Sequence, residues 1–454
     1  MVRLDEQNRE QYAKLILDAL ETENKEQFRD NFLELHPTDQ VEIFVSVEIE
    51  KRVRIYRYLF PKEFAEIFGG LEIKRQKEIF QELDETYSSN VFNHMSADDV
   101  AYFLVELKDE KAQEILQKMN KEEAVSVKEL LSYPPETAGA IMTKEFVSLS
   151  STDRSSNVIE QLRESGPEAE TIYYLYVVDE LDKLVGVVSL RDLIIAPPDK
   201  RIENIMSTRV VSVPDDMDQE EVAMLIKDYD FLAVPVISKQ QHLLGIITFD
   251  DVIDIIEEET TEDLGEISAA KGATDVNVSS FTAAKKRAPW IILLMFFGLI
   301  TAEIIGQFEE TLEQIVLLAA FIPLIMDSAG NTGTQSLAVA VRGLALGTIH
   351  KKSIGKMIRR EFGTGVMLGL ICMIMLAAII TILYQGNWMI AVIVGVTIFL
   401  TLSIATVIGS TVPLIINKLK LDPAIASGPF ITTVNDILGL LIYFTIATSL
   451  LEFL

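Results

Sequence analysis

The sequence predicts a multidomain membrane protein: an all-α helical N-terminal domain, an α/β region built from a tandem repeat, and a five-helix transmembrane domain. Charge is the first observation behind this prediction. From Phe281 onward there are 11 basic and 9 acidic residues, which leaves 29 basic and 59 acidic residues, a net charge of −30, in the first 280. The second observation is an internal repeat over residues 138–262, and the third is a series of short helix starts before residue 135.

The first 135 residues show the pattern of short stacked helices. Helix starts recur at 35–39, 59–63, 95–99 and 119–123, each with a turn or capping residue followed by acids. The steps between them are 24, 36 and 24 residues, and such a regular spacing is typical of a helical solenoid. We therefore predict an acidic helical domain at 1–135, in which single acids cap helices by default.

The repeat aligns two segments of each copy. Ile-Met-Thr at 141–143 recurs as Ile-Met-Ser at 205–207, and residues 186–194 recur as 245–253. Each copy reads as a helix, two strands (173–178 and 184–188; 233–237 and 243–247), and a helix opening at Ser189 or Thr248. These copies resemble tandem CBS domains, whose Gly-x-x-Ser/Thr-x-x-Asp signature ends here in Asp192 and Asp251. The predicted boundaries are 136–200 and 201–263.

The second copy ends in a block of acids. Eight of the fourteen residues at 250–263 are Asp or Glu, and none is basic. Asp254, Glu258 and Glu262 are spaced by four, so a helix stacks them on one face, where like charges destabilise it by a few tenths of a kcal/mol per pair. One interpretation is a solvated face. The other is a low-affinity divalent-cation sensor, which the position directly before a predicted linker helix at 264–287 favours.

The remaining residues, 288–454, predict five membrane spans, at about 289–308, 312–337, 363–384, 388–416 and 423–451. All 11 basic residues from Phe281 onward fall on alternate connections: three directly before the first span, six between 342 and 360, and Lys418 with Lys420. By the positive-inside rule the N-terminus is cytoplasmic and the C-terminus lies outside, in a multi-pass protein of the plasma (inner) membrane.

Polar residues interrupt three of these spans. The second contains the glycine-rich stretch 327–336, which predicts a broken helix beside a wet cavity. Asp436 lies in the fifth span, and an intramembrane carboxylate is a candidate functional residue. The alternative for Asp436 is interhelical hydrogen bonding, and for Asp327 it is capping of the broken helix. Since the spans hold no basic residue, a transported cation is a natural counter-charge.

Several classes of function are excluded or disfavoured. The acidic surplus repels phosphates, so we expect no nucleic-acid partner. One cysteine, Cys372, excludes an internal disulfide framework, and four scattered histidines disfavour a His-based metal centre. The charged start of the chain is not a signal peptide. The sequence has no P-loop, which argues against ATP hydrolysis, and we expect no enzyme activity.

Taken together, the domain order, Gly-Asn-Thr-Gly-x-Gln-Ser at 330–336, and Asp-Pro-Ala at 422–424 with Asn-Asp at 435–436 resemble the MgtE family of magnesium transporters. The resemblance covers essentially the whole chain. It implies a homodimeric Mg²⁺ channel in the lipid bilayer, gated closed by cytoplasmic Mg²⁺ bound between the soluble domains, with the linker 264–287 as a plug. Mg²⁺ is then both substrate and regulator.

The resemblance also implies site residues. The pore residues are Asp436, Asn331, Gly330, Gln335 and, as a departure from the glycine-only form of the motif, Asp327. The cytoplasmic sensor acids are Asp218, Glu220, Asp230, Asp251, Asp254, Glu259, Glu262, Asp263, Glu63 and Asp98. Some members of the family bind ATP in the CBS pair, and Arg191 with Asp192 is the corresponding position for a regulatory nucleotide.

Two alternatives stay open at this stage. One is a carrier of another cation, Mn²⁺, Co²⁺ or Na⁺. The other is a CBS-containing membrane sensor that transports nothing, although a simple anchor needs neither Asp436 nor the polar stretch at 327–336.

Overall fold

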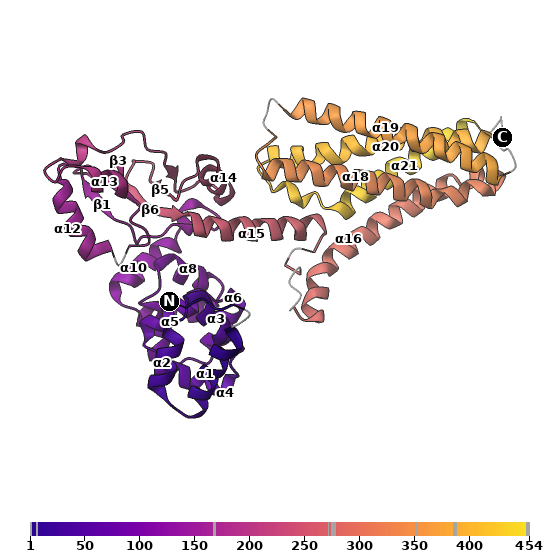
Figure 1. The fold of residues 1–454 in the computed structure, drawn as a ribbon. Coiled ribbons are helices and arrows are strands. Elements are labelled where there is room, and N and C mark those ends of the chain that lie inside the picture. Colours follow the sequence, from indigo (N-terminus) through magenta and orange to yellow (C-terminus); the bar gives the residue numbers. More distant parts are fainter. Residues whose placement is uncertain are drawn as a thin grey trace. The chain divides into compact units, whose positions relative to one another are not determined.

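The computed structural model describes residues 2–5, 8–166, 169–270, 272–273, 278–349, 353–384 and 388–450. The chain divides into two compact units, Met1–Ile255 and Ile256–Leu454, and each is described by itself (Figure 1). The predicted connection 385–387 and residues 271 and 274–277 of the predicted linker lie outside the described residues.

The N-terminal part of the first unit is a stack of short helices, as predicted. The four predicted starts are the beginnings of α3, α5, α8 and α10, and proline at the first position of α3 and α5 suits a helix start because that position needs no N–H donor. The helices are α1 (Arg9–Glu21), α2 (Lys25–Leu33), α3 (Pro37–Ser46), α4 (Ile49–Tyr58), α5 (Pro61–Gly69), α6 (Ile73–Phe80), α7 (Glu85–Phe92), α8 (Ala97–Val105), α9 (Asp109–Lys118) and α10 (Lys121–Leu130).

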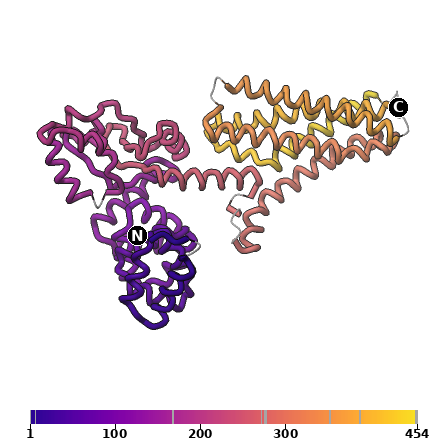
Figure 2. The backbone as a smooth tube through the Cα atoms, viewed as in Figure 1, coloured from indigo at the N-terminus to yellow at the C-terminus, as the bar shows by residue number. Residues whose placement is uncertain are grey.

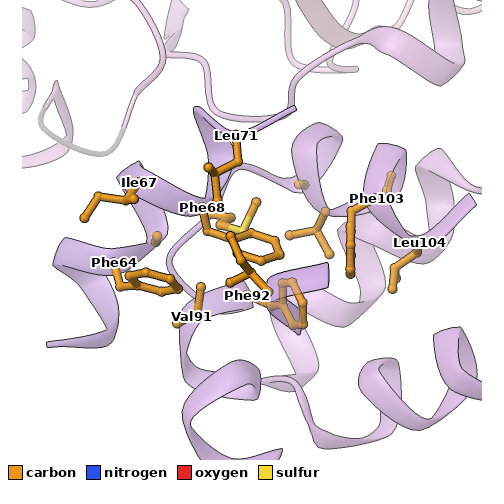
Figure 3. Close-up of a cluster of buried hydrophobic side chains, with 14 of the residues drawn as sticks. Phe64, Ile67, Phe68, Leu71, Val91, Phe92, Phe103 and Leu104 are labelled. Atoms are coloured by element: carbon orange, nitrogen blue, oxygen red, sulfur yellow. The ribbon is translucent and has the colours of Figure 1, made fainter. Parts of the chain in front are cut away.

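Aromatic side chains fill the core of this stack. The ring of Phe68 contacts both Phe92 and Phe103 in edge-to-face geometry, with ring centroids 5.7 Å and 5.4 Å apart (Figure 3). Phe92 and Phe103 stack on each other at 5.5 Å. All three rings are buried, and such pairs add to the stability that their apolar area supplies.

Two three-stranded sheets follow, one for each repeat. In each, the first strand pairs parallel with the second, and the second pairs antiparallel with the third. The strands are β1 (Ser148–Ser150), β2 (Tyr174–Val178), β3 (Leu184–Ser189), β4 (Val213–Pro214), β5 (Ala233–Ile237) and β6 (Leu243–Thr248). The helices are α11 (Ala138–Ile141), α12 (Ser155–Ser165), α13 (Leu190–Ile195), η2 (Ile202–Asn204), α14 (Gln219–Tyr229) and α15 (Phe249–Ile267).

The two repeat motifs interlock across the pair of sheets. A Cβ on Gly186 would lie 2.6 Å from Sδ of Met206, and a Cβ on Gly245 would lie 2.8 Å from Sδ of Met142. The methionine side chain of each copy therefore packs directly against the signature glycine of the other copy. This reciprocal contact explains why both halves of the motif recur, because a side chain at either glycine would push the opposite methionine away.

Among its described residues, the second unit contains five helices long and apolar enough to cross a membrane, which confirms the predicted number (Figures 1 and 2). Helices α18, α19 and α21 all pack against α20, and α16 packs against α21. The elements are α16 (Ser280–Gln307), α17 (Glu309–Gln314), η3 (Val316–Phe321), α18 (Ile322–Ala345), α19 (Ile354–Leu383), α20 (Trp388–Lys418), η4 (Pro423–Ile425) and α21 (Gly428–Ser449).

The polar stretch of the second span does not break its helix, so that expectation was wrong. Helix α18 is continuous through Gly330, and the irregular backbone lies before it, in η3. Hydroxyl side chains of α18 bond to carbonyls of their own helix: Oγ of Ser328 to O of Leu324 at 2.6 Å, and Oγ1 of Thr334 to O of Gly330 at 2.7 Å. The stretch is therefore compatible with a helix in an apolar medium, where internal hydrogen bonding is required.

The predicted linker 264–287 is divided among several elements. Its first residues are the end of α15, and its last residues are the first turns of α16. Lys286 Nζ and Arg287 Nη2 donate to the carbonyls of Gly272 and Ala273, at 2.5 Å and 3.0 Å, and so connect the start of α16 to the described part of the linker.

Candidate functional sites

Six carboxylates from three parts of the first unit meet in one cluster. Two are in the first turn of α8, two are in the first turn of α15, and two come from the segments around β1 and β2. Acid pairs suit helix N-termini because they face the positive end of the helix dipole. We call the cluster the acidic junction; its members are Asp98, Asp99, Glu145, Glu170, Asp250 and Asp251.

Glu145 connects two segments of the junction through hydrogen bonds. Its Oε1 accepts a hydrogen bond from the backbone N–H of Ala97 at 3.1 Å, in the first turn of α8. Its Oε2 accepts from the Thr143 hydroxyl at 2.5 Å and from the Lys144 N–H at 3.0 Å. Both oxygens are thus engaged, and the start of α8 is held against the chain that enters the first repeat.

Burial and the neighbouring negative charges together raise the pKa of four other members of the junction, Asp98, Asp99, Glu170 and Asp251. Burial, then the charges of Asp99, Asp251 and Glu145, raise the pKa of Asp98 well above its ordinary value. Its Oδ1 is enclosed and has no hydrogen-bond partner among the described residues. A buried, unpaired carboxylate is costly, so the junction is a place where a cation would relieve repulsion.

Asp251 and Glu170 show the same effect. Burial raises the pKa of Asp251 to about 6, helped by Asp250 and Asp99 and opposed by the Thr248 hydroxyl, which donates to Asp251 at 2.5 Å. Partial burial and the charges of Asp251 and Asp250 raise the pKa of Glu170 to about 7. The charge of Asp254 also acts on Asp99, so this predicted sensor residue lies beside the junction.

The junction is not a closed ligand cage. Within the described residues no three acids or histidines stand close enough together to hold a bare metal ion.

The structure brings Asp98 and Asp251 together, but other predicted sensor acids lie elsewhere in the first unit. Glu63 caps α5 by accepting from the Phe60 N–H at 2.8 Å, and both of its oxygens also accept from Arg29, at 2.6 Å and 2.7 Å. Burial acts to raise the pKa of Glu63, but Arg29 and the capping bond hold it below its ordinary value. Glu63 is thus neutralised within its own domain.

Three more predicted acids belong to one helix, α14. Asp218 is its N-cap and accepts from the Glu220 N–H at 2.9 Å, Glu220 is in its first turn, and Asp230 ends it in a left-handed conformation with φ of 53°. These positions give each acid a local structural role.

A second group of acids lies at the end of α15, within the second unit. Asp263 is half-buried, and its pKa is raised to about 6 by burial and by the charges of Asp422 and Glu262, with Arg342 acting in the opposite direction. Asp422 also caps η4 through the Ala424 N–H at 2.8 Å. The predicted Glu259 is on the same helix, α15.

The membrane site is built around close helix contacts at glycines. A Cβ on Gly333 of α18 would lie 2.0 Å from Nδ2 of Asn435 on α21, and a Cβ on Gly409 of α20 would lie 2.1 Å from O of Gly333. Asp436 is held against Gly330, where a Cβ would lie 3.3 Å from its Oδ1. That oxygen and Nδ2 of Asn435 are buried without a hydrogen-bond partner in the described part of the chain.

A row of polar side chains runs along the exposed face of α18. We call Asp327, Asn331 and Gln335, which are spaced by four residues, the polar stripe. Asn331 Nδ2 donates to Oδ1 of Asp327 at 3.0 Å, and the charge of Asp327 acts on Asp436. Asp327 therefore does not cap a broken helix; it is one of two carboxylates on adjacent membrane helices.

The signature aspartates of the two repeats have the same local geometry but different surroundings. Ser189 Oγ donates to Asp192 at 2.7 Å and accepts from the Asp192 N–H at 3.1 Å, which caps α13. Asp192 and the neighbouring Arg191 are exposed, whereas the equivalent Asp251 lies in the acidic junction. Arg191 and Asp192 are thus available to a ligand from solvent.

Sequence reasoning missed five acids of these clusters as site residues: Asp99, Glu145, Glu170, Asp250 and Asp422. Asp99 adjoins the predicted Asp98, and Asp422 stands in the Asp-Pro pair before the fifth span, so neighbourhood alone could have suggested both. Glu145 and Glu170 carry no local signal, because their role arises from contacts with distant segments.

Family models match all three parts of the chain. A model described as a divalent cation transporter matches residues 322–446, one described as the MgtE intracellular N domain matches residues 35–136, and CBS domain models match residues 138–199 and 202–258.

Characterised relatives align over nearly the full length. The magnesium transporter MgtE of Bacillus subtilis is 42% identical over 425 residues, covering 94% of each chain. That of Enterococcus faecalis is 40% identical and covers 98% of each chain, and that of Thermus thermophilus is 35% identical and covers 98% of this chain and 99% of the relative.

Solved structures of soluble regions are also similar. The soluble part of a magnesium transporter is 42% identical with a TM-score of 0.54, covering 55% of this chain and 99% of that one. The cytosolic domain of the Mg²⁺ channel MgtE in complex with ATP is 35% identical with a TM-score of 0.51, covering 54% of this chain and 99% of that one.

Proposed function

The chain belongs to the MgtE family of divalent cation transporters, and from this premise we propose that it is a Mg²⁺-selective channel for magnesium uptake, closed by cytoplasmic Mg²⁺. The observation that supports conduction is Asp436, an intramembrane carboxylate beside a second carboxylate, Asp327; one oxygen of Asp436 is buried and has no hydrogen-bond partner among the residues that the structure describes. The five spans predicted from the sequence hold no basic residue, and a divalent cation supplies the counter-charge to these two carboxylates.

Conduction follows from the hydration of the ion. Asp436 contacts the water shell of a largely hydrated Mg²⁺, and the amides of Asn331 and Gln335 accept hydrogen bonds from those waters. An inward divalent charge gains about 4.6 kcal/mol per 100 mV of membrane potential, twice the value for a single charge. The electrochemical gradient therefore drives uptake without ATP hydrolysis.

A homodimer provides the other wall of the pore. The polar stripe on α18 is exposed in a single chain, and polar side chains at membrane depth face protein or water rather than lipid. A second copy facing the stripe encloses it and brings two Asp436 side chains to one axis. This supports the homodimer as the conducting unit.

Closure is driven by charge neutralisation in the soluble region. Without a cation, Asp98, Asp251 and their neighbours repel one another; a bound Mg²⁺ stabilises the arrangement in which they are close. Asp263 at the end of α15 and Asp422 at the start of η4 respond in the same way, next to the linker 264–287 that plugs the pore. Of the remaining predicted sensor acids, Asp218, Glu220, Asp230, Asp254, Glu259 and Glu262 belong to the same proposal, whereas Glu63 is left out of it because Arg29 already neutralises its charge.

Orientation and regulation complete the proposal. The basic connections keep the N-terminus cytoplasmic and the C-terminus outside the plasma (inner) membrane. ATP is a regulatory ligand at Arg191 and Asp192, supported by the ATP complex of the similar cytosolic domain and by the exposure of both residues.

The test is Mg²⁺ flux into liposomes containing the purified full chain. We expect a flux in the parent that Asp436→Ala abolishes, while Glu303→Ala, which removes a carboxylate near the end of α16, preserves it. Normal flux in Asp436→Ala would refute the pore assignment. No flux in the parent would favour a membrane sensor, and equal competition by Mn²⁺ or Co²⁺ would refute Mg²⁺ selectivity.

A further inference from the structure

A buried carboxylate that the proposed mechanism does not use lies between two membrane helices. Glu361 is in the third turn of α19 and its side chain is 7% exposed. Its Oε2 accepts a hydrogen bond from the hydroxyl of Ser336 on α18 at 2.8 Å. Its Oε1 accepts from Nη2 and Nε of Arg360, at 2.9 Å and 3.2 Å.

Ser336 differs from the other hydroxyl residues of α18. Ser328, Thr332 and Thr334 donate to carbonyls of their own helix, at 2.6, 2.8 and 2.7 Å. Ser336 instead donates across to Glu361 on a different helix. Because a buried carboxylate is costly without partners, this bond and the Arg360 pair are what make Glu361 tolerable there.

Glu361 is itself held firmly, through the packing of α19 on α20. One turn after Glu361, a Cβ on Gly365 would lie 2.4 Å from Oγ1 of Thr406 and 2.8 Å from O of Leu402. A Cβ on Gly369 would lie 2.8 Å from O of Phe399. These close backbone approaches fix the height and rotation of α19, and therefore the position of the Glu361 carboxylate.

The partner of this bond carries the polar stripe. Ser336 directly follows Gln335 and lies five residues after Asn331, on the face of α18 that is buried, while both amides lie on the exposed face. In a rigid helix, fixing Ser336 fixes the direction of the opposite face. A rotation of α18 that moved Ser336 away from Glu361 would turn Asn331 and Gln335 by the same angle.

We infer that Glu361 is a positioning residue, which sets the rotation and register of α18 through Ser336 and so aims the amides of the polar stripe at the permeating ion. The part of this inference that concerns the ion rests on the proposed function. Its consequence is that loss of the bond changes the affinity of the pore for Mg²⁺ as well as the amount of folded protein.

The transport test separates affinity from abundance. In proteoliposomes, Glu361→Ala and Ser336→Ala should each raise the Mg²⁺ concentration for half-maximal flux at least threefold, and the double variant should show the same shift as either single variant because one bond is lost in all three. Glu361→Gln, whose amide oxygen still accepts from Ser336, should keep the parent value. Ser328→Ala, which removes a hydroxyl bonded within its own helix, is the matched control.

A second readout does not need transport. In a chain with Cys372→Ser and Asn331→Cys, the new thiol lies on the polar stripe of α18. Its rate of modification by a small cationic reagent reports how accessible that face of the helix is. Glu361→Ala and Ser336→Ala should change this rate at least threefold, and Glu361→Gln and Ser328→Ala should not.

The outcomes are distinguishable. Unchanged half-saturation and thiol rates in Glu361→Ala, or additive effects of the two alanine variants, would overturn the positioning role. Absence of Mg²⁺ flux in the parent would refute the proposed function, while the thiol rates would still decide whether Glu361 positions α18. If the alanine variants do not accumulate, a Glu361→Gln chain with shifted half-saturation would contradict the inference by itself.

Discussion

Replacing Asp251 by Asn should stabilise the cation-free soluble region. The pKa of Asp251 rises from 3.8 to about 6 through burial and the charges of Asp250 and Asp99. At 1.36 kcal/mol per pKa unit, ionised Asp251 costs the folded state about 2–3 kcal/mol at neutral pH. Asn removes that charge, and its amide oxygen can still accept the Thr248 hydroxyl bond.

The sign of the pH dependence follows from the same shift. Folded Asp251 holds its proton more tightly than the unfolded chain does, so the stability it contributes is present below about pH 4 and is lost as the pH rises through about 6. The Asn variant has no carboxyl group at this position, so it does not lose this stability as the pH rises. The difference in stability between variant and parent should therefore be near zero at about pH 4 and reach its full size above about pH 7.

The assay is calorimetric melting of a fragment ending at residue 270, a choice supported by the crystallised soluble part of a relative. With a chelator present, the gain of about 2–3 kcal/mol should raise Tm by roughly 4–12 °C, at about 2–4 °C per kcal/mol for a region of this size. Excess Mg²⁺ should stabilise the parent more than the variant, because the cation binds the intact junction more tightly.

The matched control is Asp192→Asn, the equivalent position of the first repeat, where the aspartate is exposed and bonded to Ser189. It should give no gain in Tm. The electrostatic account of the junction would be refuted if the Asp251→Asn fragment melted at or below the Tm of the parent in chelator. It would also be refuted if the gain in Tm were the same at about pH 4 and above about pH 7.

Three further variants test other parts of the structure. Phe68→Ala should cost about 3–5 kcal/mol of unfolding free energy, measured by denaturant titration of the same fragment, because it empties a buried aromatic core. Glu63→Gln should lower Tm, opposite in sign to Asp251→Asn, since it weakens the Arg29 pair and the α5 cap; a gain would support a sensor role for Glu63 instead. Gly409→Ala should reduce both the yield of monodisperse full chain and its Mg²⁺ flux, because the new Cβ would meet O of Gly333 at 2.1 Å; normal yield and flux would contradict the close packing of α18 on α20.

Much of the fold could be predicted because its signals are local. The starts of α3, α5, α8 and α10 follow from capping and turn residues, and the strands of both repeats follow from short apolar runs bounded by turns. The break in the second span was mispredicted for an equally local reason. Glycines and hydroxyls in 327–336 indicate a break when read along the chain, but in the structure they allow close contact with α20 and α21 and bond within α18.

The candidate sites were predictable only in part. Asp251 and Asp98 were both predicted from the sequence, and they lie in one cluster. Glu145 and Glu170 belong to the same cluster, but nothing in the sequence indicates it. A carboxylate that caps a distant helix, as Glu145 caps α8, has no periodicity or motif of its own. Glu63 shows the opposite case, since its acidic helix start looks like that of Asp98 but Arg29 neutralises it.

By itself, the sequence determined the number of spans, the acidic character of the soluble region and the presence of two matching repeats, because hydrophobic length, charge and repetition are properties of consecutive residues. The tertiary structure alone decided which acids share a cluster and which are paired with a base. Asp98 and Asp251 are separated by more than a hundred residues, and only packing buries both carboxylates and brings the charge of Asp251 close to Asp98 and that of Asp99 close to Asp251, which together raise both pKa values. Their repulsion arises from that packing, which is also why a cation can act there.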